Sequence, residues 1–68
     1  MNYLEWSQEY YDTAAQLAEV IERLKAERKS SSLSQKKELD AKIAQFKIYY
    51  GECVQTADLL KQRHSDAA

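Results

Sequence analysis

The chain has 68 residues, of which 44% are hydrophobic and 31% are charged, and its formal net charge is −1. This balance excludes a whole-molecule attraction to nucleic acid or anionic lipid, and no apolar stretch approaches the roughly 18 residues of a membrane span. One cysteine and one histidine provide neither an internal disulfide nor a tetrahedral zinc site within one chain. We expect one cytoplasmic domain without metal or cofactor, of the kind common in bacteria and their mobile elements, and so short that a partner chain completes its core.

The first predicted helix spans about residues 3–29. Acidic residues lie toward its start, and Arg28 and Lys29 close its end, which is the arrangement that the helix dipole favours. Apolar side chains recur at steps of three and four residues, the pattern of a helix that buries one face against another helix. This stripe consists of Tyr3, Trp6, Tyr10, Thr13, Leu17, Val20 and Leu24.

A serine-rich connector over residues 30–34 separates this helix from a second one, predicted at about 35–63 and followed by a frayed tail at 64–68. Ser32 and Gln35 have the spacing of a capping box, and Ser34 is a competing N-cap. The stripe of the second helix consists of Leu39, Ile43, Phe46, Tyr50, Cys53, Ala57, Leu60 and His64. The short connector predicts an antiparallel hairpin. Folding the chain about residues 31 and 32 pairs residues whose numbers sum to about 63, such as Leu24 with Leu39.

Apolar residues outside these stripes predict self-association. A second line on the first helix includes Leu4, Tyr11, Ala14 and Ile21, and an isolated helix pair in water normally shows only one such stripe. We therefore expect an all-α, coiled-coil-like hairpin that dimerises into a four-helix bundle. The candidate interaction surface consists of Tyr11, Ala15, Ala18, Ile21, Ile48, Tyr49 and Gly51. Glycine inside a helix costs about 1 kcal/mol relative to alanine, and we expect Gly51 to permit close approach of another helix or ring.

Charge is distributed unevenly along the chain. Residues 22–42 hold seven cations and four anions, a net charge of +3, whereas residues 1–21 hold four anions and no cation. The end of the hairpin near the connector is therefore basic. This basic tip, which could contact nucleic-acid phosphates, consists of Arg23, Arg28, Lys29, Lys36 and Lys37.

The sequence contains no constellation that indicates catalysis. Cys53 and His64 are three helical turns apart on one face, about 16 Å, which is too far for a nucleophile and its base. No catalytic, cofactor-binding or metal-binding residues are predicted. The leading interpretation is therefore a small protein–protein interaction module, an adaptor, assembly factor or regulator, that binds itself and an unidentified protein. The first alternative is a nucleic-acid-associated protein that uses the basic tip.

A second alternative comes from a family resemblance over residues 34–40. The segment Ser34-Gln35-Lys36-Lys37-Glu38-Leu39-Asp40, followed by Ile43 and Tyr49 or Tyr50, resembles the Ser-Gln-x-Leu-Asp signature of the sporulation-regulating aspartyl-phosphate phosphatases. Those proteins are also short helical hairpins. In this chain two additional residues separate the serine and glutamine from Glu38-Leu39-Asp40. The resemblance implies a regulator that dephosphorylates response regulators and depends on Asp40.

Overall fold

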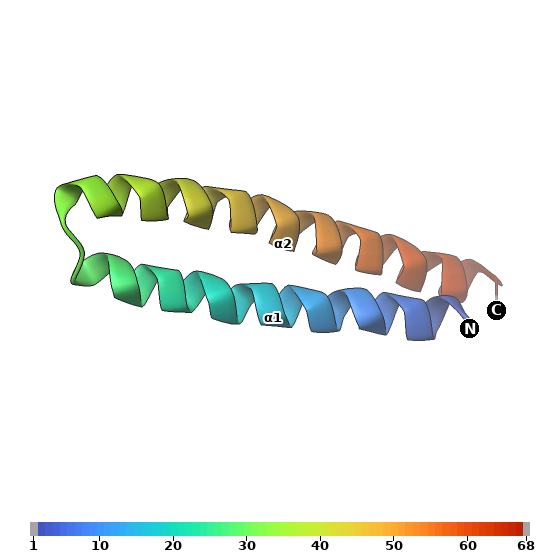
Figure 1. The fold of residues 1–68 in the computed structure, drawn as a ribbon. Helices are drawn as coiled ribbons and strands as arrows, with labels where there is room; N and C mark the ends of the chain where they lie inside the picture. The colour runs from blue at the N-terminus through green and yellow to red at the C-terminus, as the bar shows by residue number, and fades with distance from the viewer. Residues whose placement is uncertain (1, 68) are drawn as a thin grey trace.

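Two long α-helices, joined by a short connector, make up the structure. The computed structural model describes residues 2–67. Helix α1 spans Tyr3–Lys29 and helix α2 spans Leu33–Ala67, and the two run antiparallel, side by side (Figure 1). The resulting rod measures 53 × 14 × 13 Å. The expected all-helical hairpin is therefore confirmed.

Helix α1 occupies the range expected from the sequence because both of its ends are capped locally. The side chain of Asn2 accepts a hydrogen bond from the backbone N–H of Glu5 at 2.8 Å, which satisfies a donor that the helix cannot pair internally. At the other end, the backbone N–H of Ser30 donates to the carbonyl oxygen of Glu27. Arg28 and Lys29 lie in the last turn, where the helix dipole favours cations.

The connector is shorter than expected because Ser32 caps α2. The backbone N–H of Gln35 donates to the Ser32 hydroxyl at 3.3 Å, and the backbone N–H of Ser32 donates to the Gln35 side chain at 3.1 Å. These reciprocal bonds are the capping box that the spacing indicated. Helix α2 consequently begins at Leu33, two residues before the expected start, and it continues through residues 64–67, which were expected to fray.

The register of the two helices differs from the expected one. Two hydrogen-bonded pairs connect the helices, Tyr11 with Asp58 and Arg28 with Asp40, and their residue numbers sum to 69 and 68 rather than 63. These two pairs therefore join side chains five to six positions from the partners that a sum of 63 predicts. The first turn of α2 extends beyond the end of α1, and Leu33 there is 75% exposed.

The buried line on α1 also differs from the expected stripe. It consists of Ser7, Ala14 and Ile21, which recur every seven residues, whereas the side chains of Tyr3, Trp6 and Thr13 are exposed. The distance between packed helices depends on the side chains at the contact. Small residues at positions 7 and 14 allow close approach there, and the large rings lie to one side.

The stripe expected on α2 is closer to what the structure shows. Its buried members are Leu39, Ile43, Ala57 and Leu60, but Tyr50 is exposed. A single facing helix encloses only the side chains along the line of contact, so a large ring can remain partly in water.

Candidate interaction surface

The buried line of α1 separates two flanks of the hairpin. From Ala14, the residues three before and four after it, Tyr11 and Ala18, lie on one side. The residues four before and three after it, Tyr10 and Leu17, lie on the other side. The two flanks therefore carry different side chains and are described separately below.

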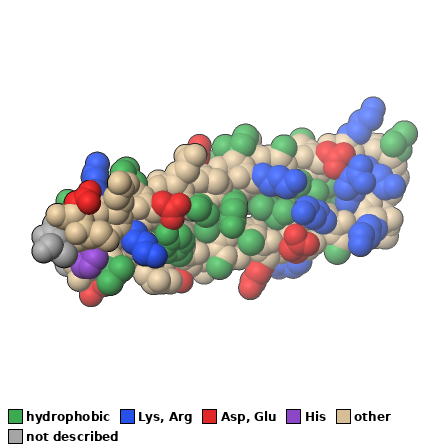
Figure 2. Space-filling model, turned by 180° about the vertical axis from the view of Figure 1, so that it is seen from behind, with side chains coloured by type: hydrophobic (Ala, Val, Ile, Leu, Met, Phe, Trp, Pro, Cys, Tyr) green, Lys and Arg blue, Asp and Glu red, His purple; other side chains and the backbone are tan. Residues whose placement is uncertain are grey.

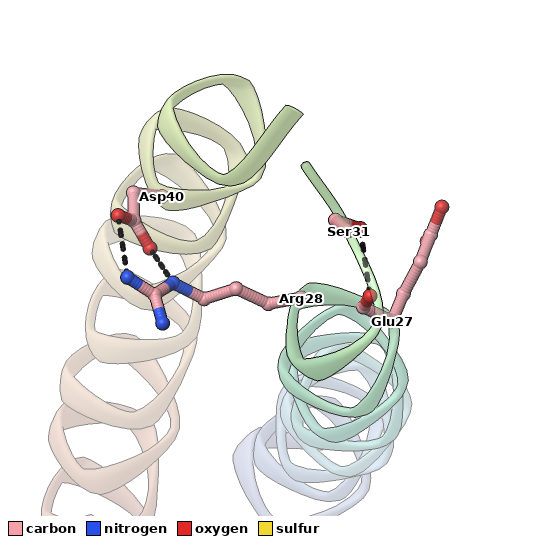
Figure 3. A network of polar contacts seen from close by, with 4 residues as sticks. All are labelled: Glu27, Arg28, Ser31 and Asp40. Atoms are coloured by element: carbon pink, nitrogen blue, oxygen red, sulfur yellow. Dashed lines mark hydrogen bonds and ion pairs between the residues drawn. The ribbon is translucent and has the colours of Figure 1, made fainter. Parts of the chain in front are cut away.

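The flank that contains Tyr11, here called the polar flank, is closed by contacts between the helices. The Tyr11 hydroxyl donates a hydrogen bond to the carboxylate of Asp58, and this bond, together with burial, raises the pKa of Tyr11. Near the connector, Arg28 Nε donates to Asp40 Oδ1 at 2.6 Å and Arg28 Nη2 donates to Asp40 Oδ2 at 3.2 Å (Figure 3). At the end of α1, on the side away from Asp40, the Ser31 hydroxyl donates to the Glu27 carbonyl oxygen at 2.7 Å (Figure 3). Tyr11 and Arg28 of α1 thus each have an acidic partner on α2.

The opposite side of the hairpin, here called the aromatic flank, carries large apolar side chains without such partners. On α2, Asp58 follows Ala57 by one residue and Tyr49 precedes it by eight, so helix geometry places Tyr49 opposite the polar flank. The aromatic flank consists of Tyr3, Trp6, Tyr10, Leu17, Val20 and Leu24 of α1 with Phe46, Tyr49 and Cys53 of α2.

Exposure distinguishes the aromatic flank from an ordinary helix surface. Trp6 is 44% exposed and Tyr3 is 40% exposed, and a shallow hollow of about 170 Å³ lies between Trp6, Glu9, Tyr10 and Thr13. Farther along the rod toward the connector, the rings of Phe46 and Tyr49 on α2 meet edge to face with centroids 6.2 Å apart, a favourable arrangement for aromatic pairs. Large amphipathic rings that remain half in water are typical of protein-binding surfaces.

The residues predicted as the interaction surface do not form one surface. Ile21 is buried against α2, so its assignment to an exposed surface is wrong. Tyr11 and Ala18 are half-buried on the polar flank, and Ala15 is exposed. Ile48 and Tyr49 are both exposed, but as consecutive residues they point about 100° apart around α2. Of this set, only Tyr49 belongs to the aromatic flank.

Gly51 does not provide the close approach that the sequence suggested. A Cβ atom built on Gly51 would have no neighbour within 4 Å, and no glycine in residues 2–67 has a positive φ. Replacing Gly51 with alanine should therefore stabilise α2 by about 1 kcal/mol, because alanine loses less conformational entropy in a helix. Thermal unfolding followed by circular dichroism should show a higher melting temperature. A lower melting temperature would mean that another chain packs against this position.

Lysine and arginine side chains gather at the connector end of the hairpin, as Figure 2 shows for one face. Arg23, Lys29 and Lys37 are exposed and Lys36 is half-buried. Arg28, however, is paired with Asp40, and nearby Lys25 lies 3.4 Å from Glu22. The structure thus brings the predicted basic tip together but neutralises part of it.

The pairing of Arg28 with Asp40 has a measurable consequence for protonation. The hydrogen bond from Arg28 lowers the pKa of Asp40; desolvation offsets part of this, and the positive charges of Arg28 and Lys36 lower the pKa further. A carboxylate with a lowered folded-state pKa stabilises the fold above its unfolded pKa of about 3.9, and this contribution is lost as the pH falls through the folded value. A carbon-13 NMR titration should give a pKa for the Asp40 carboxyl group that is below the ordinary range for aspartate. In Arg28→Gln the pKa of Asp40 should rise, and an unchanged value would exclude the ion pair.

Both carboxylate oxygens of Asp40 accept hydrogen bonds from Arg28, so the residue central to the phosphatase resemblance lies in an interhelical ion pair.

Within residues 2–67, no three His, Cys, Asp or Glu side chains converge as metal ligands. None of the helical segments in that range is long and apolar enough to cross a membrane. Comparison of this chain with protein families, with curated proteins and with solved structures found no match.

Proposed function

We propose that this chain is a small protein–protein interaction module that works as a self-associating helical hairpin. Two copies would pack their aromatic flanks together and close a four-helix bundle. The observation that carries this proposal is the exposure of the rings of Tyr3, Trp6 and Tyr49 on one flank, whereas polar pairs of Tyr11 with Asp58 and of Arg28 with Asp40 bridge the helices on the other. Burying such rings against a second copy removes apolar area from water, which is the main favourable term in association.

The thin core of the hairpin supports the same proposal. Six hydrophobic residues are buried among those that the structure describes, and two of the six are alanines. Chains of this length are marginal even when their cores are well filled, and oligomerisation is one of the usual remedies. A second hairpin would supply apolar surface that the first lacks.

The accessible area of the hairpin also fits a dimer. It amounts to 5152 Å², whereas a compact monomer of 7.9 kDa should expose about 4,400 Å². The excess of roughly 700 Å² is close to the 800 Å² or so that each partner buries in a stable protein–protein interface. The long, narrow shape thus exposes about as much extra surface as one interface of ordinary size would cover.

The proposed role is binding rather than catalysis, and the nucleic-acid alternative has weaker support. Arg28 and Lys25, at or beside the basic tip, already have acidic partners, and phosphate binding depends on cations that are free to displace counterions. Fluorescence anisotropy with labelled DNA and RNA distinguishes the two roles. Tight binding that weakens steeply with salt would favour nucleic acid.

Sedimentation equilibrium at micromolar concentrations tests the proposal directly. We expect a species of twice the 7.9 kDa chain mass, with dissociation on dilution. A folded species of a single chain mass, unchanged up to about 100 μM (roughly 5.5 kcal/mol of association free energy), would contradict self-association.

A further inference from the structure

We infer that the two hairpins of the dimer pack antiparallel, so that the connector of each copy lies beside the chain termini of the other. This inference rests on the proposed function and adds the orientation of the partner. It is carried by two features of the hairpin, the separation of charge along its length and the order of side chains along its aromatic flank.

Positive and negative charges lie at opposite ends of the rod, because the connector end and the terminal end are formed by different parts of the chain. The connector end, residues 22–42, has a net charge of +3, and residues 1–21 contribute −4 to the terminal end. Residues 43–66 of α2 run beside residues 1–21 and contribute no net charge, with three cations and three anions. The hairpin is therefore basic at one end and acidic at the other, over a length of 53 Å.

The two possible orientations use these charges in opposite ways. A parallel dimer would place the basic ends together and the acidic ends together, whereas an antiparallel dimer places each basic end beside an acidic one. Packed helices lie about 8–10 Å apart, which is close to the Debye length of about 8 Å at physiological ionic strength. Charges at the rim of the interface therefore still interact across it, and they favour the antiparallel dimer.

The order of side chains on the aromatic flank leads to the same orientation. Along α1, the rings of Tyr3, Trp6 and Tyr10 occupy the terminal end of this flank and the aliphatic side chains of Leu17, Val20 and Leu24 occupy the other end. On α2, the rings of Phe46 and Tyr49 lie on the connector side of Asp58, the partner of Tyr11. A two-fold axis midway along the α1 series, near Thr13, seats the α1 rings of each copy on the aliphatic side chains of its partner's α1. Large side chains that face smaller ones interdigitate better than rings that face rings. Thr13 is exposed, as a residue at such an axis must be in the free hairpin.

Distances between spin labels distinguish the two orientations. A label on Ser34→Cys marks the connector end and a label on Gln16→Cys marks the middle of the rod, both in a Cys53→Ala background. Both positions are exposed. For the antiparallel dimer we expect a Ser34 pair separated by close to the 53 Å length of the hairpin and a Gln16 pair within about 20 Å, two helix spacings.

Each outcome of the labelling decides a different point. A dimer in which both pairs lie within about 20 Å would be parallel, which overturns this inference and leaves the proposed function intact. Absence of any dipolar coupling at Gln16 in the folded, labelled chain would contradict the dimer itself.

The salt dependence of dimerisation, measured on the unlabelled native protein, provides a second test. Raising the salt from about 0.05 to about 0.5 M should weaken an antiparallel dimer about threefold and would tighten a parallel one.

Discussion

Replacing Ile21 with alanine should destabilise the hairpin by about 3 kcal/mol, because it removes a large buried side chain from the contact between the helices. Ile21 is 6% exposed and lies on the buried line of α1. A domain of this size has a free energy of unfolding of roughly 3–10 kcal/mol, so the substitution removes a large part of it. Urea denaturation followed by far-UV circular dichroism, at equal chain concentrations, measures the loss.

Ile48→Ala is the matched control because it makes the same chemical change at a residue that is 56% exposed. We expect a change within about 0.5 kcal/mol, as is usual for surface substitutions. The comparison also tests which side chains of α1 face α2. The stripe expected from the sequence did not include Ile21, whereas the structure buries it. Equal losses at positions 21 and 48 would show that α1 does not face α2 through Ile21.

Trp6→Ala should weaken self-association by about 30- to 300-fold, which corresponds to roughly 2–3.5 kcal/mol. The indole is half exposed in the single hairpin and would be enclosed at the proposed interface, where a buried tryptophan often dominates the binding energy. Because Trp6 is not part of the buried line of α1, the hairpin itself should keep its helical content. Sedimentation over a dilution series gives the dissociation constant.

Leu4→Ala provides the control for this experiment. Leu4 is 46% exposed and stands two residues from Trp6, but it precedes Ser7 by three positions and therefore lies on the polar flank. Its truncation should change the dissociation constant by less than about threefold, as expected of a residue outside the interface. Similar losses from Leu4→Ala and Trp6→Ala would show that the aromatic flank is not the contact surface.

The parts of the fold that depend on nearby residues could be predicted from the sequence. The two helices and the Ser32–Gln35 capping box follow from helix-favouring composition and from spacings of three or four residues. The face of α1 that is turned toward α2 could not be predicted from the sequence. Periodicity identified two apolar lines one residue apart, and the bulkier one was taken as the core. The helices instead meet along Ser7 and Ala14, because close packing there depends on small side chains rather than on hydrophobicity.

The interhelical polar contacts were beyond sequence reasoning for a related physical reason. Asp58 and Asp40 lie on the polar flank, but their partners Tyr11 and Arg28 can be identified only once the register is known. The length of the connector sets that register, and Ser32 rather than Ser34 caps α2. A shift of one turn pairs each carboxylate with a different residue. The division into a polar and an aromatic flank therefore emerged only from the folded chain.

The melting temperature of the native chain as a function of its concentration tests most directly whether a second copy completes the core. If folding and pairing are coupled, each tenfold increase in concentration adds about 1.4 kcal/mol of stability and should raise the melting temperature by about 5 °C. We expect this rise between about 1 and 100 μM, which spans two such steps. A sharp, cooperative transition at one temperature over this whole range would show that the single hairpin is stable without a partner.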